Sequence, residues 1–178
     1  MNLNQIEKKL REAEFFLGEM RKQETRAFGD REPFDFYLSA FLSAARTVDY
    51  RLRHEQAATY PRWRKAWDAR LASNEKSLIK FLVDDRNVEV HESGSGRSVK
   101  TAEIPLSGNT TYSDDSGTLQ VFAPPRPLIP QRVGPDAVIM KPSYHFTIAG
   151  AERKATDACA EYLSLLTRMV EQFKADRP

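Results

Sequence analysis

Residues 33–52 read PFDFYLSAFLSAARTVDYRL and carry the clearest helical pattern in the chain. Proline suits the first turn of a helix, because the N–H that it lacks would be unpaired there. Small residues beside the apolar face would let a second helix approach closely. The apolar residues recur at steps of three and four, which predicts one buried face of a core helix: Phe34, Leu38, Phe41, Ala45, Val48 and Leu52.

Four further stretches share this periodicity, so the sequence predicts a mainly α fold, an up-and-down helical bundle of about five helices. Tyr60-Pro61 and Ser73-Asn74 mark two helix starts. We expect a single helical domain over residues 1–178, with a β-rich insertion at residues 93–150 before the last helix. The remaining helices are expected at residues 3–28, from 60 to about 71, from 73 to about 91, and 151–175.

The expected insertion lacks charged helical periodicity and is richer in threonine, proline and glycine. The turn-forming residues 113–117 predict a hairpin, and residues 123–135 predict an extended loop. Short strands are expected at Val99–Ile104, Leu119–Phe122, Val138–Met140 and Tyr144–Ile148.

The amino-acid composition bears on which partners, cofactors and cellular compartment the protein could have. A net charge of +2 over 178 residues does not by itself indicate a nucleic-acid partner. Cys159 is the only cysteine, which excludes an intramolecular disulfide, and we expect it to be a buried core thiol. The three histidines are scattered and no glycine-rich phosphate loop is present, so we expect neither a metal nor a cofactor. Without a signal-like start or a long apolar run, we expect a cytoplasmic protein with no membrane association.

One stretch carries chemistry: Arg86-Asn87, three further residues and His91, at the end of the fourth expected helix. Arg86 and Asn87 continue its apolar rows, where a guanidinium needs an acidic side chain, a second subunit or a phosphate as partner. This Arg-x4-His pattern, with asparagine directly after the arginine, resembles the signature of the HEPN superfamily (higher eukaryotes and prokaryotes nucleotide-binding domains). The helices around residues 36–44 and 159–163 are also similar to HEPN-like bacterial proteins.

The resemblance covers residues 1–92 and 145–176, and it implies a metal-independent endoribonuclease that acts as a homodimer, as toxins and defence proteins of the family do. RNA would be its substrate, and an antitoxin or a nucleotidyltransferase its protein partner. His91 would act as general acid or base, and Arg86 would stabilise charge on the phosphate. Asn87 would orient either group.

Geometry adds a condition to this expectation. Positions 86 and 91 lie about 140° apart on a regular helix of ~3.6 residues per turn. Either the helix unwinds before His91, or two copies meet and pool their motifs, as in the family. The acidic neighbours Asp84, Asp85 and Glu89 keep another interpretation open, in which Arg86 is ion-paired and His91 only interacts with the helix end.

Basic residues suggest an RNA-binding face: Arg46, Arg53, Arg62, Arg64 and Lys65, with Arg51 beside them and aromatic neighbours that would stack on bases. The alternative interpretation is a solvated helix surface. Two other functions stay open as well. One is a catalytically inactive HEPN-like module that binds nucleotide, RNA or a partner protein. The other is a structural dimer whose insertion recognises another protein.

Overall fold

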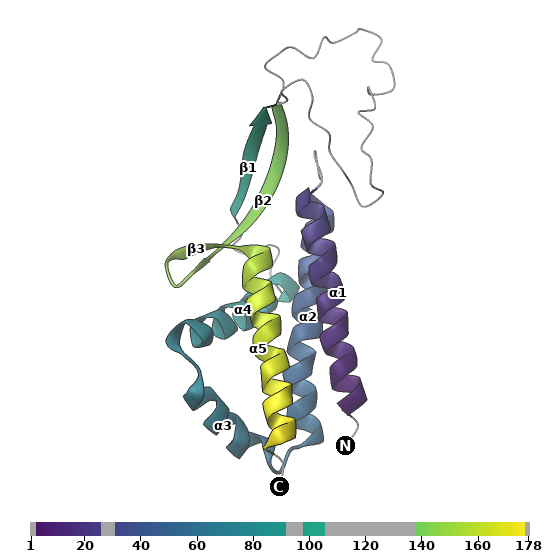
Figure 1. Ribbon diagram of the computed structural model, residues 1–178, viewed down its shortest axis with the longest axis vertical. Helices are drawn as coiled ribbons and strands as arrows, with labels where there is room; N and C mark the ends of the chain where they lie inside the picture. Colours follow the sequence, from purple (N-terminus) through teal and green to yellow (C-terminus); the bar gives the residue numbers. More distant parts are fainter. Residues whose placement is uncertain (1–2, 26–30, 92–97, 106–137, 177–178) are drawn as a thin grey trace.

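A computed structural model describes residues 3–25, 31–91, 98–105 and 138–176, with side chains described for residues 4–25, 32–83 and 143–176 (Figure 1). This part of the chain is mainly helical and holds five helices, which confirms the predicted fold class. None of these helices is both long and apolar enough to cross a membrane. They are α1 (Leu3–Thr25), α2 (Arg31–Glu55), α3 (Tyr60–Arg70), α4 (Ser73–His91) and α5 (Ala155–Ala175).

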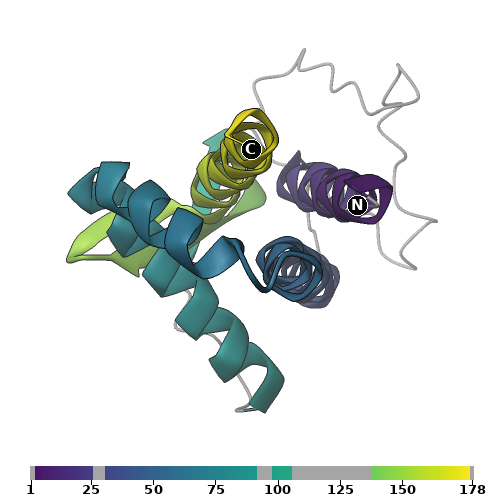
Figure 2. The ribbon, with the colours of Figure 1, turned by 90° about the horizontal axis from the view of Figure 1, so that it is seen from below.

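Three long helices, α1, α2 and α5, run side by side along the long axis of the molecule (Figure 1). Seen from below, these three form a triangle, and α3 and α4 lie across the side formed by α2 and α5 (Figure 2). α4 contacts both α2 and α5. Its C-terminal end extends past α2 in this view, so the end of α4 lies at an edge of the bundle.

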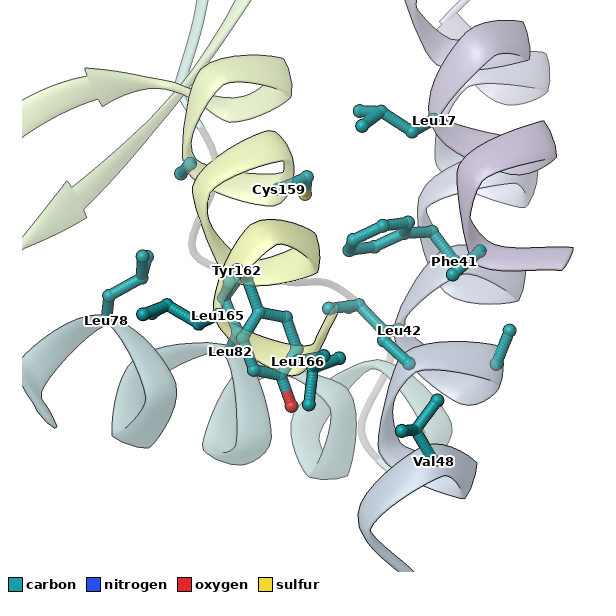
Figure 3. Packing of buried hydrophobic residues seen from close by; sticks show 14 of the residues in the cluster. Leu17, Phe41, Leu42, Val48, Leu78, Leu82, Cys159, Tyr162, Leu165 and Leu166 are labelled. Carbon is teal, nitrogen blue, oxygen red and sulfur yellow. The ribbon is translucent and has the colours of Figure 1, made fainter. Parts of the chain in front are cut away.

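The core lies where these helices meet, and the stripe predicted for α2 is buried along its whole length. Figure 3 shows Phe41 and Leu42 of α2 pointing toward α5. Cys159 of α5 is fully buried in the same core, as predicted. Leu78 and Leu82 give α4 its buried face. The spacing of apolar residues therefore predicted correctly the buried stripe of α2, the burial of Cys159 in α5 and the burial of Leu78 and Leu82 in α4.

A three-stranded antiparallel sheet of order β1-β2-β3 lies at one end of the bundle, and its β1–β2 part extends beyond the helices (Figure 1). Phe34 of α2 stacks on Tyr144 of the middle strand, with ring centroids 3.6 Å apart. Phe146, two residues along, lies 5.2 Å from the ring of Phe81 in α4. These aromatic contacts fix the sheet to the helices. The strands are β1 (Ser98–Pro105), β2 (Val138–Ile148) and β3 (Ala151–Lys154).

Two predicted boundaries in this region are wrong. The two strands expected at 138–140 and 144–148 are one strand, because β1 pairs with β2 without a break across residues 141–143. The last helix begins at Ala155 and not at 151. Ala149 and Gly150 both have positive φ, 50° and 80°, and form a two-residue turn that pairs Ile148 with Ala151. The hairpin at 113–117, the strand Leu119–Phe122 and the loop at 123–135 lie outside the described residues, as does the end of the first helix at 26–28.

Candidate functional site

The sequence motif lies on the last turns of α4, which is helical without interruption from Ser73 to His91. The backbone therefore does not unwind before His91. On this regular helix, Arg86 and His91 leave the axis in directions about 140° apart. The side chains of Arg86, Asn87 and His91 lie outside the described part of the structure. The structure shows only that the backbone of these three residues is helical.

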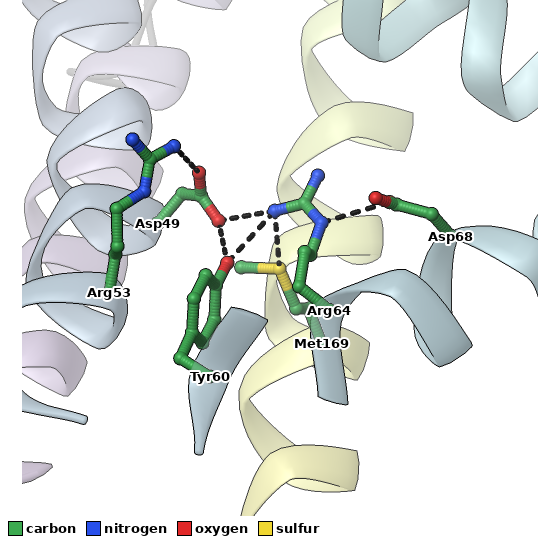
Figure 4. Close-up of polar contacts among 6 residues, drawn as sticks. All are labelled: Asp49, Arg53, Tyr60, Arg64, Asp68 and Met169. Atoms are coloured by element: carbon green, nitrogen blue, oxygen red, sulfur yellow. Dashed lines mark hydrogen bonds and ion pairs between the residues drawn. The ribbon is translucent and has the colours of Figure 1, made fainter. Parts of the chain in front are cut away.

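A half-buried polar cluster joins α2, α3 and α5 (Figure 4). Asp49 of α2 lies at its centre, and its Oδ1 accepts hydrogen bonds from the Tyr60 hydroxyl and from Nη1 of Arg64. Arg64 also donates from Nε to Oδ1 of Asp68 at 2.9 Å, and its Nη1 lies 3.5 Å from the Met169 sulfur. Two carboxylates therefore hold one guanidinium in place.

The surroundings of Tyr60 and Arg64 raise the pKa of both groups and so favour their protonated forms. Burial and the charge of Asp49 raise the pKa of Tyr60 above its ordinary value of 10. Burial lowers the pKa of Arg64, but the charge of Asp49 and the hydrogen bonds to Tyr60 and Asp68 outweigh burial, and the net effect is a raised pKa. Both groups keep their protons at neutral pH, so the network is intact there.

A cavity of about 110 Å³ lies between this cluster, α4 and α5. Its polar side is formed by Arg46, Asp49, Arg53 and Arg64, and Ile79 and Val83 of α4 contribute to its apolar side. Asn87 is four residues after Val83 and so continues the same row of α4. The motif therefore begins within one turn after the last α4 residue of the cavity wall, on the same helix.

No family model, curated protein or solved structure matches this chain. The HEPN resemblance therefore remains an expectation that depends on the motif in α4 and on the helices that the sequence places around it.

Tyr162 of α5 lines the cavity with a side chain that is almost fully buried. Its hydroxyl makes no hydrogen bond to any residue in the described ranges, in contrast to the hydroxyl of Tyr60. Burial, followed by the negative charge of Asp49, raises the pKa of Tyr162 above 10. The phenol therefore stays protonated and offers one donor to the cavity.

The structure separates the five basic residues predicted to bind RNA into two groups. Arg46, Arg53 and Arg64 line the cavity, and Arg64 is already held by carboxylates. Arg62 and Lys65 of α3 are exposed and are not part of the cavity wall. The structure thus brings three of the five together around one site.

A second polar group lies on β2 and β3, away from the cavity. Ser143 Oγ and His145 Nε2 are hydrogen-bonded at 2.8 Å, and Nδ1 of His145 lies 3.9 Å from Oε1 of Glu152. A serine, a histidine and an acid in this order are the groups of a nucleophilic hydrolase. The distance to Glu152 is too long for a hydrogen bond, so we assign this group no catalytic role. Among the described residues, no three His, Cys, Asp or Glu side chains are placed to hold a metal ion.

The sequence analysis did not identify Asp49 and Tyr162, which line the cavity, as candidate site residues. Asp49 with Arg53, and Arg64 with Asp68, are i,i+4 pairs of opposite charge, a spacing that can be read from the sequence. The pairing of Asp49 with Arg64 on another helix cannot be read that way. Tyr162 stands on an apolar stripe, where its spacing predicts only burial.

Proposed function

We propose that this chain is a metal-independent endoribonuclease of HEPN type that acts as a homodimer, with Arg86, Asn87 and His91 as its catalytic residues. One observation carries the proposal. The Arg-Asn-x3-His sequence stands on the end of an unbroken helix, α4, which is the fourth of the five helices in the mainly helical part of the chain that the structure describes. This is the position that the resemblance implies for the motif.

The continuity of α4 supports the dimer in this proposal. Because positions 86 and 91 point about 140° apart, one straight helix cannot aim both side chains at one phosphate. A second copy of α4, related by a two-fold axis, would supply the missing partner. The C-terminal end of α4 lies at an edge of the bundle (Figure 2).

In the proposed reaction, the 2′-oxygen of a ribose forms a bond to the adjacent phosphorus, and the bond from phosphorus to the 5′-oxygen breaks. The proton of the 2′-hydroxyl passes to a base, and the 5′-oxygen receives a proton, leaving a 2′,3′-cyclic phosphate. His91 serves one of these proton transfers, since an imidazole with a pKa near ~6.5 does so at neutral pH. Arg86 stabilises the charge that grows on the phosphate oxygens.

The test is cleavage of labelled RNA in the presence of a chelator. Wild-type protein is expected to leave 2′,3′-cyclic phosphate ends, and His91→Ala is expected to abolish the products. His54→Ala is the matched control, because His54 is an exposed histidine on α2 outside the motif. Circular dichroism shows whether both variants keep the fold. Intact RNA with wild-type protein, or equal cleavage by His91→Ala, would contradict the proposal.

A second candidate is a catalytically inactive module that binds nucleotide, RNA or a partner protein such as an antitoxin or a nucleotidyltransferase. The observation that favours it is the grouping of Arg46 and Arg53 at one cavity, which requires no reaction. It predicts that RNA or a partner is retained without cleavage. Filter binding, run on the same samples as the cleavage assay, distinguishes the two candidates.

A further inference from the structure

One face of α2 carries two large aromatic side chains that are exposed. Phe36 is 64% exposed and Tyr50 is 62% exposed. They are 14 residues apart, about four turns at ~3.6 residues per turn, so both lie on the same side of the helix. The opposite side carries the buried stripe of α2, which includes Leu38 and Ala45. Large apolar groups gathered on one exposed face indicate a surface that interacts with another macromolecule.

Between the two rings, this face of α2 is formed by small side chains. Ala40, Ser43 and Thr47 continue the row from Phe36 at steps of three and four and are half-buried. Thr47 Oγ1 donates a hydrogen bond to the Ser43 carbonyl oxygen at 2.7 Å, so this hydroxyl can be covered without losing its partner. A second helix can therefore approach the backbone of α2 closely between the rings, since the distance between packed helices depends on the side chains at their contact.

The charges at the two ends of this face fit a second copy of α2. Glu32 in the first turn is exposed and acidic, and His54 in the last turn is exposed and basic. Each lies four residues beyond an aromatic ring, Glu32 before Phe36 and His54 after Tyr50. In an antiparallel pair that sets Phe36 against Tyr50 of the second copy, Glu32 therefore faces His54 of that copy. The helix dipoles are also opposed in this arrangement, whereas a parallel pair would bring like charges together.

We propose that two copies of this chain associate through this face of α2 in antiparallel orientation, with Phe36 of each copy packed against Tyr50 of the other. The two-fold axis then passes beside Ser43, the midpoint between the two rings, and every contact is made twice. α4 packs against α2, and its C-terminal end extends past α2 (Figure 2), so this symmetry places both α4 ends on the same side of the dimer. The interface is that of the proposed nuclease homodimer, and only its part in cleavage rests on that proposal.

Sedimentation equilibrium of the full chain without RNA measures this association. We expect a wild-type dimer that dissociates on dilution, with a dissociation constant that Phe36→Lys raises by about tenfold or more. Phe15→Lys is the matched control, because Phe15 is 60% exposed on α1 and is not part of this face. Circular dichroism of both variants checks that replacing an exposed ring leaves the fold intact. The proposal is overturned if the wild type is monomeric, if Phe36→Lys has no effect, or if both variants weaken the dimer equally.

Cysteine cross-linking tests the orientation of the two helices. Position 43 meets itself at the two-fold axis, so Ser43→Cys should form a disulfide-linked dimer on mild oxidation. Ser39→Cys is the control: this serine is one turn earlier and also half-buried, but in the antiparallel pair it lies opposite Thr47 and should not cross-link. Cys159 is fully buried, so the wild type should not cross-link either. Cross-linking of Ser39→Cys as readily as Ser43→Cys, or none with Ser43→Cys, would contradict the antiparallel pair.

The two proposals can fail separately. Association through α2 without any RNA cleavage would refute only the nuclease. Cleavage of RNA by a protein whose association is unchanged by Phe36→Lys would refute only this interface.

Discussion

Arg64 of α3 and Asp49 of α2 form an ion pair in which the two side chains are only 22% and 24% exposed. The pair fixes the short helix α3 against α2 and forms the polar side of the cavity. A charge buried to this degree is tolerated because its partner and further hydrogen bonds compensate it. The stability of this corner and the shape of the cavity therefore depend on the same two residues.

Asp49→Ala should lower the free energy of unfolding by about 2–4 kcal/mol, because it leaves the Arg64 guanidinium with one carboxylate and the Tyr60 hydroxyl without its acceptor. Urea denaturation followed by circular dichroism measures the change. Glu14→Gln, which alters an exposed carboxylate on α1, should stay within about 0.5 kcal/mol of wild type. Equal effects of the two substitutions would show that the ion pair is not stabilising.

Stability should decline above pH 10, since the folded state raises the pKa of Tyr60 and Tyr162 above the ordinary value of 10. Below that pH both phenols are protonated in the folded and the unfolded chain. Above it the unfolded chain loses protons that the folded chain retains, which favours unfolding.

Tyr162→Phe isolates one of these two phenols. The variant should match wild type at pH 7, because no described hydrogen bond is lost, and should be more stable than wild type at pH 11. Urea denaturation at the two pH values measures this difference. Tyr50→Phe, on a side chain that is 62% exposed, is the control and should match wild type at both. If Tyr162→Phe loses as much stability as wild type on going to pH 11, the raised pKa is refuted.

The turn between β2 and β3 should respond oppositely to two substitutions. Gly150 has φ +80° and open space around the position of a Cβ, so Gly150→Ala should cost about 1 kcal/mol through the backbone alone. Ala149→Asn should stabilise by about 0.5 kcal/mol, because asparagine tolerates the positive φ that alanine adopts there. Thermal unfolding measures both changes, and a loss of stability in Ala149→Asn would contradict the assigned turn.

The helical part of the fold could be predicted from the sequence because burial follows local periodicity. The stripe from Phe34 to Leu52 and the burial of Cys159 depend on spacing within one helix, and both are confirmed. The predicted start of the last helix was wrong because residues 151–154 pair with β2 as a strand. The turn before them begins at Ala149, and alanine is not a residue that usually indicates a turn. Tertiary pairing outweighed local propensity at that point.

The candidate site could be predicted only in part. Helical spacing correctly placed Arg86, Asn87 and His91 on the end of α4. The cavity could not be foreseen, because Asp49, Arg64 and Tyr162 come from three helices and meet only through their packing. The charge on Arg46, Arg53 and Arg64 suggested an anionic ligand, but not that Arg64 is already held by two carboxylates.

Mixing two inactive variants tests the central claim most directly. Arg86→Ala and His91→Ala subunits are unfolded together, refolded as a mixture, and assayed on labelled RNA in a chelator beside the wild-type protein and each variant alone. If two copies pool their motifs, heterodimers join one intact Arg86 to one intact His91. The account then predicts that 2′,3′-cyclic phosphate products return in the mixture although each variant alone is inactive. Active wild type with an inactive mixture would contradict the shared site, and wild type that leaves RNA intact would contradict the nuclease itself.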